Sequence, residues 1–461
     1  MKYFTEPARA IPVIEADVFV AGAGTAGCIA AIAAAREGAK VVLVEKLPVP
    51  CGTLGNGGNG LSSFYNAEYD AGKAKRIVGG LAYEFMNRCV EEDVCAGLLP
   101  VPNNRHAEAY KAIPNREGLK AVFCMMLQEA GVQVYLQTML AGVYMDADAI
   151  QYAILENKDG RTAVQAKMYI DCTGDGDIAK YAGVEQVTNW QIYDQVCGGP
   201  NSLPFGLGGI DFDQALREAS DVFMLREEPE DGKEYPKKYW LKHVNNPERC
   251  KNLCAMDIRE FTSMTSFGPG EATFVNNSKG VMLDASTAEN LTKAEMEMRI
   301  RVLKMTNAMK KDIPGFQNCH MIWEAIQLGI RSSKITVCDK MLTSEEVLNA
   351  TRFDDEIGLY GFQDMVEKDP STKIHDPGYY GFPYRMLLAK GCANLFMAGR
   401  CVTHDLMAHN STRNTVGAMI MGQGAGVAAG LCVKKNCMSR ELPYQELRQE
   451  LLNQGVILSV D

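Results

Sequence analysis

The sequence predicts an α/β fold in which a nucleotide-binding domain with a parallel sheet and a β-meander is interrupted by an inserted α+β lobe. Two observations predict this class. Residues 16–46 read as an apolar run, a glycine turn, an alanine-rich helix over 28–38 and a second apolar run. This rhythm is lost over residues 185–385 and returns at residues 394–434 with an apolar run and a second helix of small residues. A single domain accounts for this order if its first and last parts are separated in the sequence by an inserted lobe.

The first unit has the parts that a dinucleotide site requires. Gly22 allows the tight turn after the strand, Gly24 lets the backbone approach a pyrophosphate, and Gly27 lets the helix pack close to the strand. The helix N-terminus attracts phosphates. Glu45, which closes the second run, can accept hydrogen bonds from a ribose and would repel a 2′-phosphate, so NADP is disfavoured. A structural glycine turn in an unrelated α/β unit is the alternative.

The next segments complete the first part of the domain. Residues 48–60 are rich in glycine and are not expected to form regular structure; they could contact a cofactor or be a flexible linker. Hydrophobic spacing predicts helices over 74–95 and 119–130. Residues 132–140 are expected to form a strand of the main sheet, followed by a β-meander over 149–170.

Two later strands end in short turns that contain glycine. The first ends at Thr173-Gly174 and the second at Gly399-Arg400. A helix is expected over 296–309 inside the lobe, and another over 414–434. We therefore place the first part of the domain at 1–184, the inserted lobe at 185–385, and the closing part with the C-terminal helix at 386–461.

Composition limits the classes of partner and site. The net charge of −10 disfavours a nucleic-acid partner. No secretory signal or membrane span is expected, which predicts a cytoplasmic protein. The 15 cysteines include no CxxC, so neither an iron–sulfur cluster nor another metal site is expected.

Four segments together resemble the FAD-dependent oxidoreductases of the glutathione-reductase-like superfamily: 17–45, 170–177, 328–343 and 382–430. They are most similar to a bacterial branch related to the FAD lobe of heterodisulfide reductase. The resemblance implies a Rossmann-like FAD-binding domain with an inserted substrate or cap lobe, and FAD as the cofactor. It implies cofactor contacts at Gly22, Gly24, Ala26, Gly27, Glu45, Lys46, Cys51, Gly52, Thr173, Gly174, Gly399, Arg400, Asn414 and Val416. Cys51 is a departure, because that branch usually has a Gly-Gly pair there.

The same resemblance suggests where catalysis occurs. His404, His409 and Arg413 precede the closing helix, which in this family borders the flavin ring, and Arg331 matches another recurrent arginine. A histidine there could act as general acid or base, and an arginine could bind a substrate carboxylate. Alternatively, each histidine caps a helix or binds backbone, and each arginine forms a structural ion pair.

The expected function is an oxidoreductase that transfers a hydride between FAD and a small organic substrate, by CH–OH or CH–NH oxidation or by C=C reduction. Two alternatives stay open: a lyase-type FAD enzyme, and an electron-transfer flavoprotein that works together with a partner protein. An FAD-dependent RNA-modifying enzyme fits poorly with the negative charge. Because no second GxGxxG unit follows a strand, we expect an external electron donor or acceptor. Separately, the chain could form a homo-oligomer.

Overall fold

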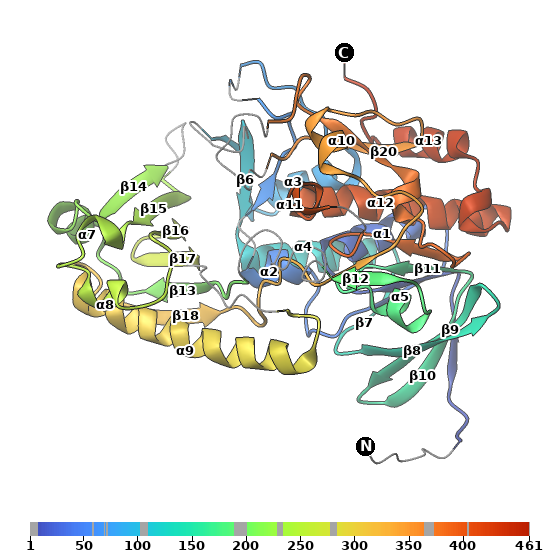
Figure 1. The fold of residues 1–461 in the computed structure, drawn as a ribbon, viewed down its shortest axis with the longest axis horizontal. Helices are drawn as coiled ribbons and strands as arrows, with labels where there is room; N and C mark the ends of the chain where they lie inside the picture. Colours follow the sequence, from blue (N-terminus) through green and yellow to red (C-terminus); the bar gives the residue numbers. More distant parts are fainter. Residues whose placement is uncertain are drawn as a thin grey trace.

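The structure is a computed structural model of the 461-residue chain. It describes residues 8–57, 60–68, 70, 72–101, 109–188, 201–227, 234–276, 284–363, 373–402 and 405–460. A main body and a smaller lobe lie side by side, with the lobe on the left in Figure 1. The predicted fold class is confirmed.

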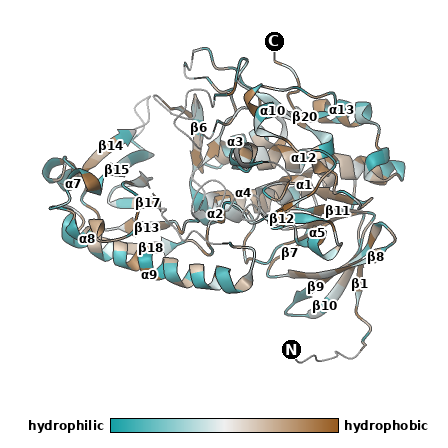
Figure 2. Ribbon diagram, in the orientation of Figure 1, coloured by the Kyte–Doolittle hydropathy of each residue, from teal (hydrophilic) through white to brown (hydrophobic). Residues whose placement is uncertain are grey.

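A five-stranded parallel sheet forms the centre of the main body. Its order is β22-β11-β2-β3-β7, and the strands are Leu395–Met397, Met168–Asp171, Val18–Ala21, Val41–Val44 and Gln133–Tyr135. Strands β2, β3 and β11 are entirely buried, which suits short, mainly apolar strands between helices. Figure 2 shows this hydrophobic centre and, in the lobe, the mainly hydrophilic helix α9 (Ala288–Asp312).

Two helices of small residues pack against each other next to this sheet. They are α1 (Thr25–Arg36) and α12 (Thr415–Lys435). A Cβ at Gly422 would lie 2.3 Å from the carbonyl oxygen of Ala26, and one at Gly426 would lie 2.3 Å from that of Ala30. The glycines of α12 therefore allow a close helix–helix contact. By length and composition α12 could span a membrane, but 89% of its most apolar window is buried inside the protein, as in a core helix.

The predicted meander is a four-stranded sheet in the order β1-β10-β9-β8. These strands are Val13–Glu15, Gly160–Gln165, Ala149–Asn157 and Met139–Asp146. The prediction of a single strand over 132–140 is wrong. The run divides at Gln137, whose φ is +51°, so that its first half joins the main sheet as β7 and its end begins β8.

Two other predictions for the first part of the domain need correction. The glycine-rich segment contains a short helix, α2 (Gly52–Gly57), which contacts α1 and α4 (Arg116–Glu129). The helix predicted over 74–95 is shorter: α3 spans Gly80–Glu91, because Gly80 has a φ of +59° and ends the extended segment before it. A three-stranded sheet completes this region, with β4 (Leu61–Ser62), β6 (Tyr110–Pro114) and β5 (Cys95–Pro100).

The lobe contains a six-stranded sheet in the order β14-β15-β16-β17-β13-β18. The strands are Phe223–Glu227, Lys237–Leu241, Thr262–Ser266, Glu271–Asn276, Phe205–Gly208 and His320–Glu324, and the helices are α7 (Phe212–Glu218), α8 (Lys251–Cys254) and α9 (Ala288–Asp312). Helix α9 is longer than the predicted 296–309. The lobe has its own hydrophobic core, from Leu203 to Leu328.

Residues after this second core return to the main body. Ile357 and Tyr380 are buried in the same core as the central sheet, so the lobe's core is shorter than the predicted 185–385. The remaining elements are α5 (Asp177–Tyr181), β12 (Gln186–Thr188), β19 (Lys334–Thr336), α10 (Ser344–Leu348), β20 (Glu356–Tyr360), β21 (Tyr380–Pro383), α11 (Leu406–Thr412) and α13 (Tyr444–Asn453), with 3₁₀ turns at His243–Asn245, Tyr384–Leu387 and Ser439–Glu441.

Candidate functional site

A cavity of about 490 Å³ lies at the carboxyl edge of the central sheet. Four of the five parallel strands deliver residues to its wall within two positions of their ends. Gly22 follows β2, Glu45 follows β3, Thr173 follows β11, and Gly399 follows β22. Parallel strands place all their carboxyl ends at one edge, which is where ligands bind in open α/β sheets.

The three glycines of the first motif are required for different reasons. Gly22 has a φ of +90°, and a Cβ there would lie 2.6 Å from the carbonyl oxygen of Cys172. A Cβ at Gly27 would lie 1.8 Å from the carbonyl oxygen of Gly22. At Gly24, in contrast, the nearest atom would be the Cα of Gly52 at 4.0 Å. Protein packing thus requires Gly22 and Gly27, whereas Gly24 leaves open space at the N-terminus of α1. This cradle fits the pyrophosphate of a dinucleotide.

Glu45 lies in the cavity wall and also holds the glycine loop. Its Oε2 accepts a hydrogen bond from the backbone N–H of Ala23 at 2.7 Å, and its Oε1 accepts one from Leu47 at 2.9 Å. The residue is 6% exposed, and burial raises its pKa although both hydrogen bonds oppose that shift. The Glu45 carboxylate therefore lies in the cavity wall with its orientation fixed by two backbone N–H groups.

Arg400 connects three loops around the cavity. Its Nε donates to the carbonyl oxygen of Gly174 at 2.9 Å, its Nη2 donates to Oδ1 of Asp175 at 2.7 Å, and its Nη1 donates to the carbonyl oxygen of Ile330. Burial by itself raises the pKa of Asp175, but the charge of Arg400 and a hydrogen bond from Ser333 outweigh it and lower that pKa. Arg400 thus stabilises the walls of the site.

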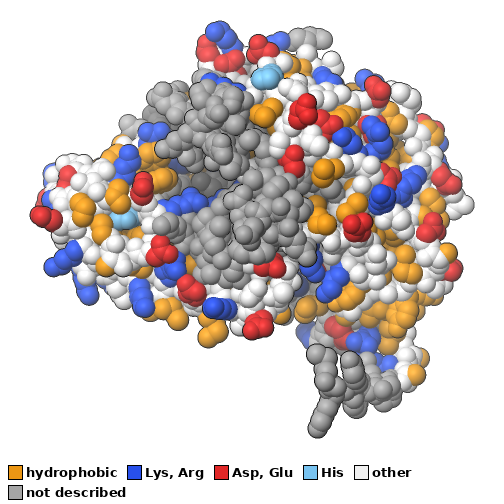
Figure 3. Space-filling view, in the orientation of Figure 1, with side chains coloured by type: hydrophobic (Ala, Val, Ile, Leu, Met, Phe, Trp, Pro, Cys, Tyr) orange, Lys and Arg blue, Asp and Glu red, His pale blue; other side chains and the backbone are white. Residues whose placement is uncertain are grey.

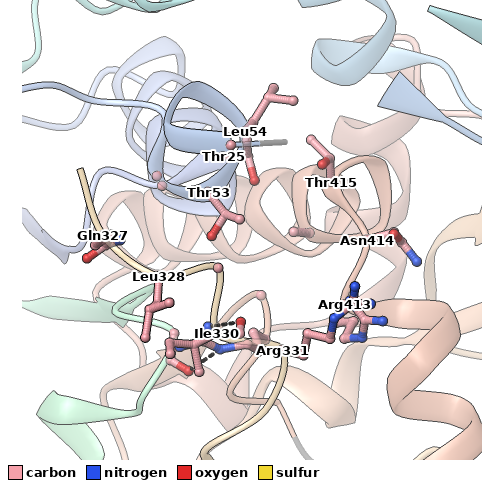
Figure 4. A pocket seen from close by; sticks show the side chains of 18 of the residues that line it. Thr25, Thr53, Leu54, Gln327, Leu328, Ile330, Arg331, Arg413, Asn414 and Thr415 are labelled. Atoms are coloured by element: carbon pink, nitrogen blue, oxygen red, sulfur yellow. Dashed lines mark hydrogen bonds between the residues drawn. The ribbon is translucent and has the colours of Figure 1, made fainter. Parts of the chain in front are cut away.

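The closing helix brings a second helix N-terminus to the cavity. Asn414 is the N-cap of α12, and Thr415 and Ala418 line the cavity beside it. Arg413, the C-cap of α11, lines the cavity together with Arg331. Figure 4 shows Arg331 and Arg413 next to each other. Two helix N-termini and two guanidinium groups therefore converge on one space.

The other predicted cofactor residues divide into two groups. Ala26, Lys46, Gly52 and Gly174 line the cavity. Cys51 and Val416 are fully buried and are not among the lining residues. Cys51 lies behind the wall, where its N–H donates to the carbonyl oxygen of Ala23 at 2.7 Å and its φ is +93°. Its contribution is to hold the glycine loop.

Neither of the two predicted histidines is among the described residues that line the cavity. His404 lies outside the described residues. His409 is fully buried on α11, and its Nε2 lies 2.9 Å from the carbonyl oxygen of Arg331. This is the backbone-binding alternative. It makes His409 a positioning residue for the loop that carries Arg331.

Several lining residues were missed by sequence reasoning. They come from separate helices, strands and loops: Thr25, Thr53, Leu54, Lys111, Ser202, Arg259, Gln327, Leu328 and Ile330. Thr25, Leu328 and Ile330 could have been found, because they lie in segments of the resemblance. Among the described residues, no group of three or more His, Cys, Asp or Glu side chains could hold a metal ion.

The cavity is more cationic than the protein as a whole. Six basic residues line it, against the three acidic residues Glu45, Asp175 and Glu295. The basic ones are Lys46, Lys111, Arg259, Arg331, Arg400 and Arg413. In a chain with a net charge of −10, this local excess favours anionic ligands.

Comparison with known proteins gives a family and distant relatives. The model of a family described as FAD dependent oxidoreductase matches residues 17–451. A digeranylgeranylglycerophospholipid reductase of Methanosarcina acetivorans is 29% identical over 185 residues, which are 37% of this chain and 40% of that protein. The match thus spans well under half of the length of this curated relative.

Two solved structures show a distant similarity to this chain. A geranylgeranyl bacteriochlorophyll reductase-like protein of Thermoplasma acidophilum is 14% identical, with a TM-score of 0.46 over 96% of this chain and 85% of that chain. A p-nitrophenol 4-monooxygenase of Pseudomonas putida is 10% identical, with a TM-score of 0.46 over 98% and 91%.

Proposed function

The chain belongs to the family of FAD-dependent oxidoreductases and is an FAD-dependent enzyme, and we propose that it transfers a hydride between the flavin and a small organic substrate. The observation that carries the proposal is the convergence of two helix N-termini and of Arg331 and Arg413 on one cavity at the carboxyl edge of the parallel sheet. We further propose that it belongs with the branch related to the FAD lobe of heterodisulfide reductase.

The residues present fit FAD. The open space over Gly24 and the first-turn N–H groups of α1 would hold the pyrophosphate, and Glu45 would hold the adenosine ribose. The N-terminus of α12 at Asn414 and Thr415 would stabilise negative charge on the reduced ring. Bound FAD supplies the hydride chemistry, while the protein supplies position and electrostatics.

The two arginines would bind and orient the substrate. A guanidinium group can hold a carboxylate through two parallel hydrogen bonds, and a site shielded from water strengthens this interaction. His409 keeps the Arg331 loop in place through its contact with the Arg331 carbonyl. These contacts suit either oxidation of a CH–OH or CH–NH group or reduction of a C=C bond.

We also propose that electrons reach or leave the flavin through a separate donor or acceptor in the cytoplasm. The chain contains one GxGxxG unit that follows a strand and precedes a helix. A nicotinamide would therefore have to share the flavin cavity, and direct reduction by NADH or NADPH should be slow.

Anaerobic spectroscopy of the holoenzyme tests the hydride transfer. Candidate alcohols and amines are added to the oxidised flavin, and candidate enoates to a photoreduced sample, while the flavin absorbance is recorded. Bleaching or reoxidation with formation of one product per flavin supports the proposal. Product formation without any net redox change would identify a lyase-type enzyme. A flavin that exchanges electrons only with a co-purified protein would identify an electron-transfer flavoprotein.

A further inference from the structure

A second cavity of about 450 Å³ adjoins the first, between the sheet of the lobe and the N-terminus of α4. The two cavities share Gly60 and Phe274 in their walls, so they are neighbours. In Figure 3 a hollow with Lys and Arg side chains opens between the lobe and the main body. The function proposed above uses only the first cavity.

The second cavity has a rigid apolar wall. Its apolar lining residues are Ile113, Pro114, Phe267, Phe274, Ile322 and Trp323. The indole Nε1 of Trp323 donates to the carbonyl oxygen of Thr273 at 2.8 Å. A Cβ at Gly206 would lie 1.9 Å from that Nε1, so the indole lies directly over the backbone of β13. The position of the Trp323 ring in this wall is therefore fixed.

A desolvated cation covers the Trp323 ring. The guanidinium of Arg116 stacks on the Trp323 ring, with its Cζ 2.9 Å from the ring centroid, and the Arg116 side chain is 14% exposed. Burial lowers the pKa of Arg116 to about 10, which leaves it charged at neutral pH. Its Nε donates to Glu117 at 3.2 Å, and the Glu117 side chain is 67% exposed.

A residue of the same wall carries a buried hydroxyl group. Thr265 lines the second cavity and is 1% exposed. Its Oγ1 has no hydrogen-bond partner within the part of the chain that the structure describes. Buried polar groups are normally paired, so a hydroxyl in this position indicates a ligand that completes it.

From these observations we propose that the second cavity binds the aromatic or conjugated body and the carboxylate of an elongated organic acid whose reacting end lies in the first cavity. Phe274 and Ile322 would contact the body, while Arg116, held by its stacking on Trp323, and Thr265 would hold the carboxylate. An arginine stacked on an aromatic ring keeps its planar donors aligned for a carboxylate. The volume is that of a site for a small molecule. This inference rests on the proposed function, because it assigns the substrate class of that enzyme.

Calorimetric titration of the holoenzyme with trans-cinnamate tests the inference, with cinnamamide and acetate as matched probes. We expect cinnamate to bind at least about tenfold more tightly than either, since cinnamamide lacks the charge and acetate lacks the aromatic body. Arg116→Gln should weaken cinnamate binding about tenfold or more and remove the preference for the acid over the amide.

Thr265→Val is the variant that should disturb folding least, because it removes a hydroxyl that has no hydrogen-bond partner among the described residues and keeps the shape of the side chain. It should weaken cinnamate binding about threefold to tenfold. Thr262→Val is the control, because Thr262 lies on the same strand β16 but is not a lining residue of the second cavity. Its affinity for cinnamate should equal that of the wild type.

Two results would overturn the inference: cinnamate fails to bind at millimolar concentration, or it binds unchanged to both Arg116→Gln and Thr265→Val. Neither result affects the proposed hydride transfer, which the anaerobic experiment tests separately. Conversely, a holoenzyme that binds cinnamate through Arg116 and Thr265 but never exchanges a hydride would contradict the proposed function and leave this binding site established.

Discussion

Substitution of Gly24 by valine separates cofactor binding from folding. Gly24 has φ −68° and ψ −175°, a conformation open to any residue, and its Cβ would meet no atom closer than 4.0 Å. The change should therefore alter the stability of the cofactor-free protein by no more than about 1 kcal/mol, mainly through a poorer N-cap for α1. The added side chain occupies the space expected for the pyrophosphate.

We expect the substitution to weaken the binding of FAD without unfolding the protein. Moving the pyrophosphate off the N-terminus of α1 should remove one or two charged hydrogen bonds, about 2–4 kcal/mol in total, which weakens FAD about 30-fold to 1000-fold. The assay is reconstitution of cofactor-free protein with FAD, followed by fluorescence, together with urea unfolding of the same sample. Thermal stabilisation by saturating FAD should fall by the matching amount.

Two other glycines provide controls. Gly142 on β8 has no atom within 4 Å of its Cβ position, so Gly142→Val should change neither FAD affinity nor folding. Gly27→Ala should destabilise the protein by about 3 kcal/mol or more, because its Cβ would lie 1.8 Å from the carbonyl oxygen of Gly22. The reasoning is refuted if Gly24→Val binds FAD as tightly as wild type, or if it unfolds as Gly27→Ala does.

Three further outcomes are expected. Arg413→Lys should lower kcat/KM nearly as much as Arg413→Ala, by about 2–4 kcal/mol with FAD content unchanged, because lysine keeps the charge but loses the planar fork; a normal lysine variant would make Arg413 a structural cation. Stopped-flow mixing with NADH or NADPH should show slow reduction, and bleaching within milliseconds would reveal a nicotinamide site. Burial, followed by the charge of Asp177, raises the pKa of Asp171 to about 6. Because the folded protein then holds a proton that the unfolded chain has lost, the free energy of unfolding should fall by about 2–3 kcal/mol as pH rises from about 4 to about 6, and this slope in urea unfolding should disappear in Asp171→Asn.

The first and last units of the main domain could be predicted because their signals are local. The apolar runs became β2, β3 and β22, and the small-residue segments became α1 and α12. Local sequence patterns gave wrong predictions where tertiary contacts outweigh the intrinsic preference of a segment for a helix or a strand. A glycine-rich segment has little tendency to form a helix, yet α2 forms there because Leu54 and Asn56 are buried against neighbouring helices and Cys51 bonds to Ala23. The run over 132–140 alternates evenly, and nothing in it indicates the left-handed residue Gln137 that divides it.

The sequence by itself determined the cofactor class, since the glycine turn and Glu45 lie in one βαβ unit whose geometry is set by neighbours along the chain. Only the tertiary structure decided what surrounds that unit. Arg400 pairs with Asp175 across 225 positions in the chain, and Arg116 meets Trp323 although they belong to the main body and the lobe. Such contacts depend on how strands and helices are ordered in space. Hydrophobic periodicity records which face of each element is buried, but not which distant element covers it.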